Sequence, residues 1–247
     1  MIANLLHRIQ RKLLKTRLHP IRVFVVHNVC DTYSTIVGPR ADWVSTDDFH
    51  HSIEQLQKRY TFISIEDALH HIRHDVVRMQ DYAVLTADDG YRSVFLQLPW
   101  LIEHNVPVSL YINPKYLDGV SYSEHLWSFV HNANPNLTES EFVTGRYMTS
   151  AELQSITSSL VSIGLHGYEH INNARLSANA FREYIEKTIA AIKPYSDVIP
   201  FHAYPWGYSS EETDKVLHEL NICPLRADGL YNINDDSQIH REYLPIY

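Results

Sequence analysis

From Pro20 onward, short apolar runs alternate along the chain with amphipathic segments. The runs RVFVVHNV (22–29) and YAVLTA (82–87) are continuous and rich in β-branched residues, which is typical of buried strands. Further runs that predict strands lie at 61–65, 106–113, 160–167 and 198–205.

The segments between these runs carry apolar residues at helical spacing. In 45–60, Phe49, Ile53 and Leu56 fall on one face, and Ser and Thr residues precede them as capping candidates. Residues 114–147 lack a regular pattern and are expected to be irregular. Helices are predicted at 45–60, 65–79, 94–105, 148–156, 177–193 and 209–222, with Pro99 interrupting the third and with Ser64 and Thr149 as candidate caps.

Repeated strand-then-helix units predict parallel strands joined by crossover helices. The fold class is therefore α/β, and a chain of 247 residues without a low-complexity linker indicates a single main domain. In such folds the active site forms at the carboxyl ends of the strands. The residues that directly follow each strand are therefore the candidates for chemistry.

The first 20 residues differ in charge from the rest. Residues 1–22 hold six basic side chains and no acidic one, whereas the whole chain has a net charge of -8. Ile2, Leu5, Ile9 and Leu13 recur at helical spacing, so 1–20 is predicted to be a basic amphipathic helix. Such a helix can make a peripheral contact with an anionic membrane, or it can pack on the protein body or a partner.

The acidic body argues against nucleic acid as the main partner. Cys30 and Cys223 have no CxxC spacing and are too few to indicate a disulfide framework. The first 20 residues lack the uninterrupted apolar stretch of a secretory signal. We therefore expect a cytoplasmic protein, peripheral to the membrane if the first helix binds there; the sequence gives no indication of an oligomeric state.

Polar residues stand at or directly after the ends of the predicted strands. Because the carboxyl ends of parallel strands meet at one rim, these side chains are expected to converge there. They include His27, Asp88, Asp89, Asn113, His166, His170 and Tyr204.

Asp88 and Asp89 are adjacent carboxylates at the end of an apolar strand, where an unpaired pair of charges would be costly. A divalent metal ion removes that cost. One carboxylate and two neutral imidazoles, such as those of His166 and His170, make a three-ligand site with positions left for water and substrate. The other carboxylate is then free to accept a proton.

The motifs LTADDGY, IGLHGYEH and FHAYPWG, each at the end of a predicted strand, resemble those of the polysaccharide deacetylase family, whose domain is also called the NodB (chitooligosaccharide deacetylase) homology domain. The similarity extends over most of the chain. It implies that residues 21–247 form the catalytic domain, folded as a distorted (β/α) barrel with about seven parallel strands.

Carried over residue by residue, the resemblance implies that Asp88 is the general base. It makes Asp89, His166 and His170 ligands of a divalent metal ion, usually zinc. The metal would polarise an acetamide carbonyl and activate water, and acetate would leave an N-acetylated sugar. Residues expected beside the substrate or oxyanion are Tyr91, Tyr204, Pro205 and Trp206, with the Trp206 N–H as the oxyanion donor.

The sequence departs from the family pattern at several positions. Gly167 stands where Ser or Thr is usual, and Ala203 replaces an arginine that orients the catalytic Asp in many members. Trp206 replaces a tyrosine, so a sugar-stacking surface is an alternative role for it. For the general acid, His27 resembles the early histidine of a permuted-order subgroup, and it is favoured over His240 because it ends a strand.

Together these features predict a metal-dependent hydrolase that removes acetyl groups from the N-acetylated sugars of a polysaccharide, oligosaccharide or glycan precursor. Two alternatives remain. The chain could be a non-catalytic glycan-binding or assembly protein on the same barrel. It could also hydrolyse O-acetyl esters or other C–N bonds, because the same metal and base would serve those reactions.

Overall fold

The computed structural model describes residues 19–31, 43–74, 78, 80–133, 135–143, 146–233 and 237–247. Nearly all of the basic helix predicted at 1–20 lies outside these residues, so that helix and its membrane contact stay predictions. Among the helices of the described part, none is long and apolar enough to cross a membrane.

The main sheet is parallel throughout, with the strand order β10-β9-β8-β7-β6-β5-β1-β11 and with β4 paired to the start of β5. Parallel pairing is what the strand-then-helix pattern predicts. The strands are β1 (Arg22–Val26), β4 (Thr61–Phe62), β5 (Tyr82–Ala87), β6 (Val108–Ile112), β7 (Val161–Leu165), β8 (Phe201–Ala203), β9 (Cys223–Arg226), β10 (Ile239–His240) and β11 (Glu242–Tyr243), beside a separate pair of β2 (Asn28–Val29) and β3 (Trp43–Val44).

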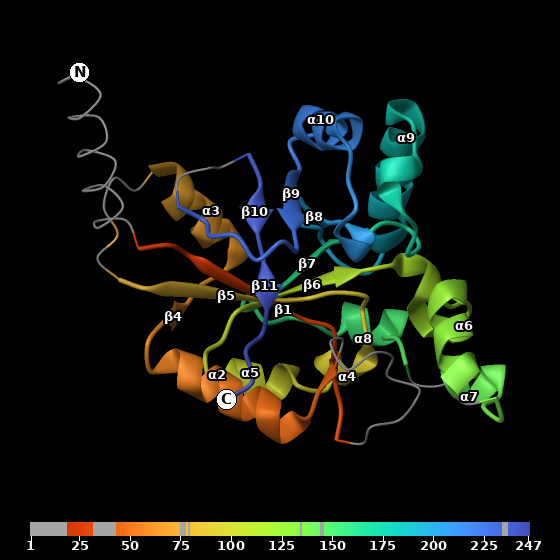
Figure 1. Ribbon diagram of the computed structural model, residues 1–247, viewed down its shortest axis with the longest axis horizontal. Coiled ribbons are helices and arrows are strands. Elements are labelled where there is room, and N and C mark those ends of the chain that lie inside the picture. The colour runs from red at the N-terminus through yellow and green to blue at the C-terminus, as the bar shows by residue number, and fades with distance from the viewer. Residues whose placement is uncertain are drawn as a thin grey trace.

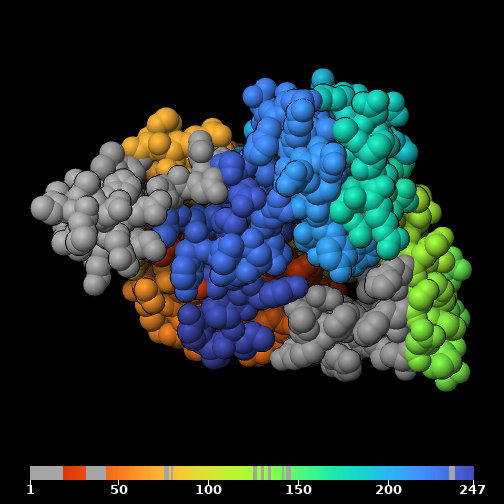
Figure 2. All heavy atoms as spheres, turned by 45° about the horizontal axis from the view of Figure 1, so that its top comes forward, coloured from red at the N-terminus to blue at the C-terminus, as the bar shows by residue number. Residues whose placement is uncertain are grey.

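The two edges of the main sheet are joined by consecutive residues. β10 pairs with β9 at one edge, β11 pairs with β1 at the other, and Arg241 alone separates β10 from β11. In Figure 2 the dark blue C-terminal residues accordingly lie against orange atoms from the first quarter of the chain. The segment 239–243 thus takes the seventh position beside the six strands from β9 to β1, and the sheet is the nearly closed barrel that the family resemblance implies.

Helices surround the strands, with α2 and α5 on one side in Figure 1 and α3, α9 and α10 on the opposite side. Several begin at the predicted caps: the Ser64 hydroxyl accepts from the Asp67 N–H at 3.0 Å, and Thr149 forms a capping box with Glu152. The helices are α2 (Thr46–Gln57), α3 (Ile65–His74), α4 (Arg92–Phe95), α5 (Leu98–Glu103), α6 (Glu124–Ala133), α7 (Glu139–Val143), α8 (Ser150–Gln154), α9 (Ala178–Ile192) and α10 (Glu211–Glu219), with 3-10 turns η3 (Pro114–Gly119), η4 (Asn173–Arg175) and η5 (Pro205–Gly207).

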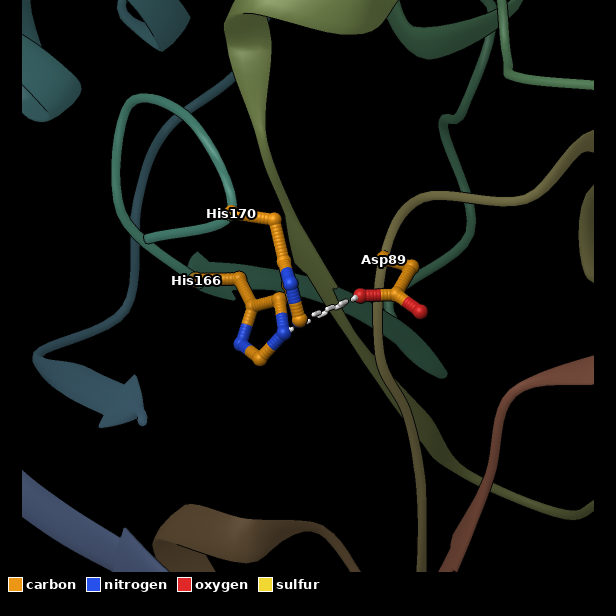
Figure 3. A group of neighbouring side chains, drawn as sticks. All are labelled: Asp89, His166 and His170. Carbon is orange, nitrogen blue, oxygen red and sulfur yellow. Dashed lines mark ion pairs between the residues drawn. The ribbon is translucent and has the colours of Figure 1, made fainter. Parts of the chain in front are cut away.

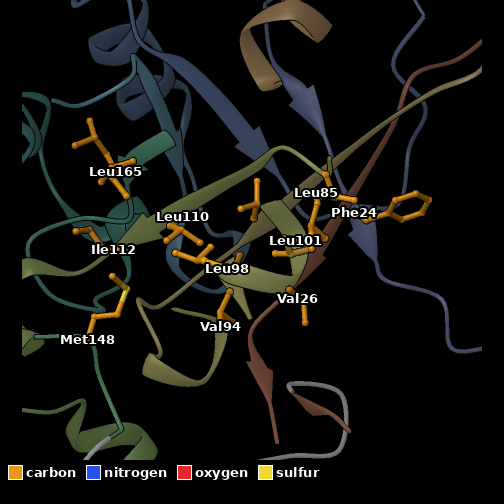
Figure 4. Close-up of a cluster of buried hydrophobic side chains, with 14 of the residues drawn as sticks. Phe24, Val26, Leu85, Val94, Leu98, Leu101, Leu110, Ile112, Met148 and Leu165 are labelled. Carbon is orange, nitrogen blue, oxygen red and sulfur yellow. The ribbon is translucent and has the colours of Figure 1, made fainter. Parts of the chain in front are cut away.

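The core lies between the central strands and the helices that cover them (Figure 4). Leu85 and Leu110 of neighbouring strands belong to the same buried cluster as Leu98 and Leu101 of α5. Val84, the neighbour of Leu85 in β5, belongs to a second buried cluster, because successive side chains of a strand point to opposite faces. Burial of both faces explains why β5 reads as a continuous apolar run.

The structure confirms the predicted strand at 82–87 to the residue and corrects the sequence analysis in two regions. The segment 114–147 is not irregular: it contains η3, α6 and α7. The tail from residue 223, for which no strand is predicted above, holds the three strands that complete the barrel. The helix predicted at 94–105 is interrupted, as expected: it is divided into α4 and α5, and Pro99 lies in the first turn of the second.

Candidate active site

A cavity of about 410 Å³ opens at the carboxyl ends of the parallel strands. The residue that directly follows each strand lines it in seven cases, which is the convergence that parallel strands predict. These residues are His27 after β1, Asp88 after β5, Asn113 after β6, His166 after β7, Tyr204 after β8, Ala227 after β9 and Arg241 after β10.

Asp89, His166 and His170 meet in this cavity. The Oδ1 atom of Asp89 lies 3.1 Å from Nε2 of His166 and 3.3 Å from Nε2 of His170, and the three atoms lie within 4.8 Å of one another. Figure 3 shows both imidazole rings facing the same carboxylate oxygen, with the histidines on the segment after β7 and Asp89 on the loop after β5. The sequence thus predicted this cluster correctly as a spatial group.

The geometry of the cluster fits a bound cation. Oδ1 of Asp89 and Nε2 of His166 are buried, and neither forms a hydrogen bond with a described residue. Nδ1 of His166 donates to the carbonyl of Ala203 at 2.8 Å, so in the neutral ring a lone pair on Nε2 faces the carboxylate. Tetrahedral zinc with ligand bonds of about 2.0–2.2 Å holds its ligands roughly 3.4 Å apart, close to the spacing found here.

The electrostatics of the two histidines agree with this fit. Burial lowers the pKa of His170 to about 4, so its ring is neutral near neutral pH and its nitrogen can serve as a ligand. Burial also opposes protonation of His166, but the carboxylates of Asp88 and Asp89 outweigh it and raise the pKa of His166. The carboxylates thus favour a positive charge at the position between the ligands.

The backbone after β5 directs the two adjacent carboxylates differently. Asp88 continues the sheet, and its N–H donates to the carbonyl of Val26 at 3.1 Å. Asp89 and Gly90 then both take φ of 70°, in the left-handed region. Aspartate and glycine tolerate this region better than most residues, and a Cβ on Gly90 would lie 3.1 Å from the side chain of Ile112. The DDG sequence therefore suits a turn that separates its two acids.

Asp88 is held by Arg241, which the sequence analysis did not identify. Nη1 and Nη2 of Arg241 donate to the two carboxylate oxygens at 2.7 and 2.8 Å, and both side chains are buried. Burial works to raise the pKa of Asp88, but the charge and hydrogen bonds of Arg241, together with nearby His166, bring it below its usual value. Asp88 therefore has a buried arginine partner, although Ala203 stands where the resemblance would place one.

The two candidate acids have different positions. His27 lines the cavity, and its Nδ1 is buried without a hydrogen-bond partner among the described residues. Its ring lies 5.9 Å from that of Tyr243. His240 is not among the lining residues, and its Nδ1 lies 2.8 and 3.0 Å from the two carboxylate oxygens of Asp228. The geometry therefore favours His27 over His240 as a group that can reach substrate.

Three of the four residues expected beside the substrate line the cavity: Tyr91, Tyr204 and Trp206. Trp206 is 43% exposed, has a φ of 55°, and packs edge-on against His170 with ring centroids 4.3 Å apart. The hydroxyl of Tyr204 donates to Asp214 at 2.9 Å. Pro205 is buried and is not among the lining residues, contrary to the expectation; it begins the turn η5 that carries Trp206.

Comparison with known proteins agrees with the resemblance seen in the sequence motifs. A family model described as polysaccharide deacetylase matches residues 76–225. No curated protein sequence matches the chain significantly.

Solved structures resemble the fold over nearly the whole chain. IcaB from Ammonifex degensii is 17% identical, with 93% of each chain covered and a TM-score of 0.72. A de-N-acetylase from Aggregatibacter actinomycetemcomitans is 15% identical, with 91% of this chain and 94% of that chain covered and a TM-score of 0.69. The Streptococcus pyogenes deacetylase PplD is 14% identical, with 92% and 94% covered and a TM-score of 0.67. With a family model that spans more than half of its length, the chain belongs to the polysaccharide deacetylase family.

Proposed function

We propose that this protein is a metal-dependent carbohydrate N-deacetylase in which Asp88 is the general base. The observation that carries the proposal is the different surroundings of two adjacent carboxylates. Asp89 faces two imidazole nitrogens, whereas Asp88 is bound through both oxygens by a guanidinium group. Neighbouring acids held in different environments take different roles in acid–base catalysis.

Asp89, His166 and His170 would hold the metal ion. One carboxylate and two imidazoles are donors that suit zinc, and three protein ligands leave a position for water or substrate. When bound, the ion supplies Lewis acidity toward the acetamide carbonyl and lowers the pKa of water. The hydrogen bond from His166 to the carbonyl of Ala203 fixes the ring orientation, as an outer-shell partner of a metal ligand does.

Asp88 would accept the proton of the attacking water. Arg241 keeps Asp88 ionised and fixes the direction of its carboxylate. Each carboxylate oxygen has a second lone pair beyond its bond to Arg241, so Asp88 can accept a proton while the ion pair stays intact. As the water oxygen bonds to the carbonyl carbon, its proton moves to Asp88.

His27 would protonate the leaving amine when the C–N bond breaks. This role is supported by its place in the cavity wall and by the buried Nδ1 without a described partner. The backbone N–H of Trp206 would donate to the developing oxyanion, which is consistent with the place of Trp206 in the same wall.

The shape of the site supports a sugar with an acetamide group as substrate. Tyr91, Tyr116 and Tyr147 pack together in one wall of the cavity, and Trp206 and Tyr208 are 43% and 56% exposed at its rim. Exposed aromatic faces at a cavity mouth suit the apolar faces of pyranose rings. The structure of the S. pyogenes relative was solved with acetate, the product that the proposed reaction would release.

Acetate release from a panel of N-acetylated and O-acetylated mono- and oligosaccharides, with and without a chelator, tests the proposal. We expect release from N-acetylated oligosaccharides, its loss after chelation, and its return with zinc. Activity confined to O-acetyl esters would contradict N-deacetylation. Sugar binding without turnover of any substrate would indicate a glycan-binding protein instead.

A further inference from the structure

Each residue of the segment 166–170 has a backbone hydrogen bond to a neighbouring part of the protein. The Asn113 side-chain amide donates to the carbonyls of His166 and Gly167 at 2.6 and 3.1 Å, and the Lys115 N–H donates to the carbonyl of Tyr168 at 3.0 Å. The hydroxyl of Tyr116 accepts from the His170 N–H at 3.0 Å. These contacts all come from residues 113–116, directly after β6.

The backbone of Glu169, within the same segment, is held by Tyr184 of α9. Its hydroxyl accepts from the N–H of Glu169 at 3.0 Å and donates to the carbonyl of the same residue. One side chain thus satisfies both backbone polar groups of Glu169, the residue that precedes His170. The hydroxyl of Thr188 donates to the carbonyl of Tyr184 at 2.7 Å, within the same helix.

Gly167 leaves the space that Tyr184 occupies. A Cβ at residue 167 would lie 2.6 Å from the Tyr184 hydroxyl oxygen and 2.8 Å from a ring carbon, closer than atoms pack. Gly167 also has a φ of 82°, which strains any residue with a side chain. A Ser or Thr at 167, expected from the resemblance, would therefore be incompatible with Tyr184 in its present place.

We propose that Tyr184 is a positioning residue for the metal site, and that Gly167 and Tyr184 act as a complementary pair in this chain. The inference rests on the proposed function only in that His166 and His170 are taken as metal ligands. Tyr184 fixes the peptide of Glu169, which sets the direction from which the His170 ring approaches Asp89. Outer-shell contacts of this kind typically change metal affinity by about 10- to 100-fold when they are removed.

Tyr184→Phe tests the proposal, because it removes the hydroxyl and keeps the ring. The matched control is Tyr195→Phe, since Tyr195 lies just beyond α9 and is 37% exposed. Zinc affinity is measured on the purified full chain by competition with a chromophoric chelator, alongside the melting temperature of the metal-free protein. We expect a zinc Kd about 10-fold or more above that of the wild type for Tyr184→Phe, and no change for the control.

The two measurements separate positioning from a merely structural role. A lower melting temperature with an unchanged zinc Kd in Tyr184→Phe would overturn the proposal. So would a variant in which neither the melting temperature nor the zinc Kd changes. If the wild-type chain itself binds no zinc, the ligand assignment of the proposed function fails, and that failure is seen before any variant is made.

A double-mutant cycle tests the pairing of the two residues. Gly167→Ala places a Cβ against Tyr184, and Tyr184→Ala removes the ring that it would meet. We expect each single variant to bind zinc more weakly, and the double variant to lose less than the product of the two losses, because the clash is relieved. Losses that multiply would show that the two residues act independently and would overturn the pairing.

Discussion

Arg241 binds both carboxylate oxygens of Asp88, at 2.7 and 2.8 Å, from the single residue at which the chain passes between the two edges of the sheet. The segment that closes the barrel therefore also carries the residue that positions the catalytic candidate. The two residues are 153 positions apart in the sequence. Arg241 reaches Asp88 only when the barrel is closed, and its charge then keeps Asp88 ionised.

Arg241→Gln should raise the pKa of Asp88, because it removes the positive charge that opposes the effect of burial. A base with a higher pKa is protonated at higher pH, so the acidic limb of the pH profile of kcat/KM should move upward. The folded state should also lose stability, by about 3–5 kcal/mol, since a buried charge loses its partner. Arg182→Gln, which breaks a more exposed ion pair with Glu219, is the control and should leave both measurements nearly unchanged. An acidic limb that stays in place would contradict the role of Arg241.

His27→Gln should lower kcat for N-acetylated sugars by about 10²–10⁴-fold, the range for loss of a general acid. The loss should be much smaller for an aryl acetate, because a phenolate leaves without protonation. His240→Gln should leave kcat close to that of the wild type and lower the melting temperature, since it weakens the contact with Asp228. A large loss of kcat in His240→Gln, with His27→Gln unaffected, would reverse the assignment.

Trp206→Ala should raise KM for an oligosaccharide by about tenfold, equivalent to about 1.4 kcal/mol, with a smaller effect on a monosaccharide. The reason is that a ring 43% exposed at the rim can contact a sugar next to the one that reacts. Steady-state kinetics with both substrates check this. Leu230→Ala, which removes another exposed apolar side chain that does not line the cavity, is the matched control. Equal effects on the two substrates would contradict a contact with the neighbouring sugar.

Glu152 should make the stability of the fold depend on pH. Its burial works to raise its pKa, but the Thr149 backbone N–H and Arg92 outweigh this and lower it. A carboxylate with a lowered pKa in the folded state stabilises the protein above its unfolded pKa of about 4.3, and that contribution disappears as the pH falls through the folded pKa.

In Glu152→Gln the free energy of unfolding should therefore fall less steeply below about pH 5 than in the wild type. At pH 7 the substitution should lower the free energy of unfolding by about 1 kcal/mol. Urea denaturation from pH 3 to 7 measures this. The exposed Glu54→Gln on α2 serves as the control. An unchanged slope for Glu152→Gln would show that the Thr149 cap does not depend on the carboxylate charge.

Much of the fold could be predicted because the central strands are buried on both faces. Their continuous apolar runs locate the strands, although most observed strands are shorter than the predicted runs, and parallel packing then brings His27, Asp88 and His166 to one rim. The cluster of Asp89 with His166 and His170 follows from the same rule.

Arg241 could not be predicted in this way, because strands β10 and β11 are two residues each and show no periodicity. Its partner depends on closure of the barrel, which is a property of the whole chain. Arg241 is also flanked by His240 and Glu242 in the sequence, so nothing in the local pattern marks it as buried. The helices in 114–147 were missed because they are short, and Phe142 of α7 packs with Leu137 of the connecting loop in a small cluster apart from the main core.

The central claim is that the two adjacent carboxylates have separate roles, and zinc binding by Asp88→Asn and Asp89→Asn measures it most directly when acetate release is followed in the same samples. We expect Asp88→Asn to bind zinc with nearly wild-type affinity and to lose turnover, and Asp89→Asn to lose both. Loss of zinc from Asp88→Asn with retention in Asp89→Asn, or full turnover in either variant, would contradict the account.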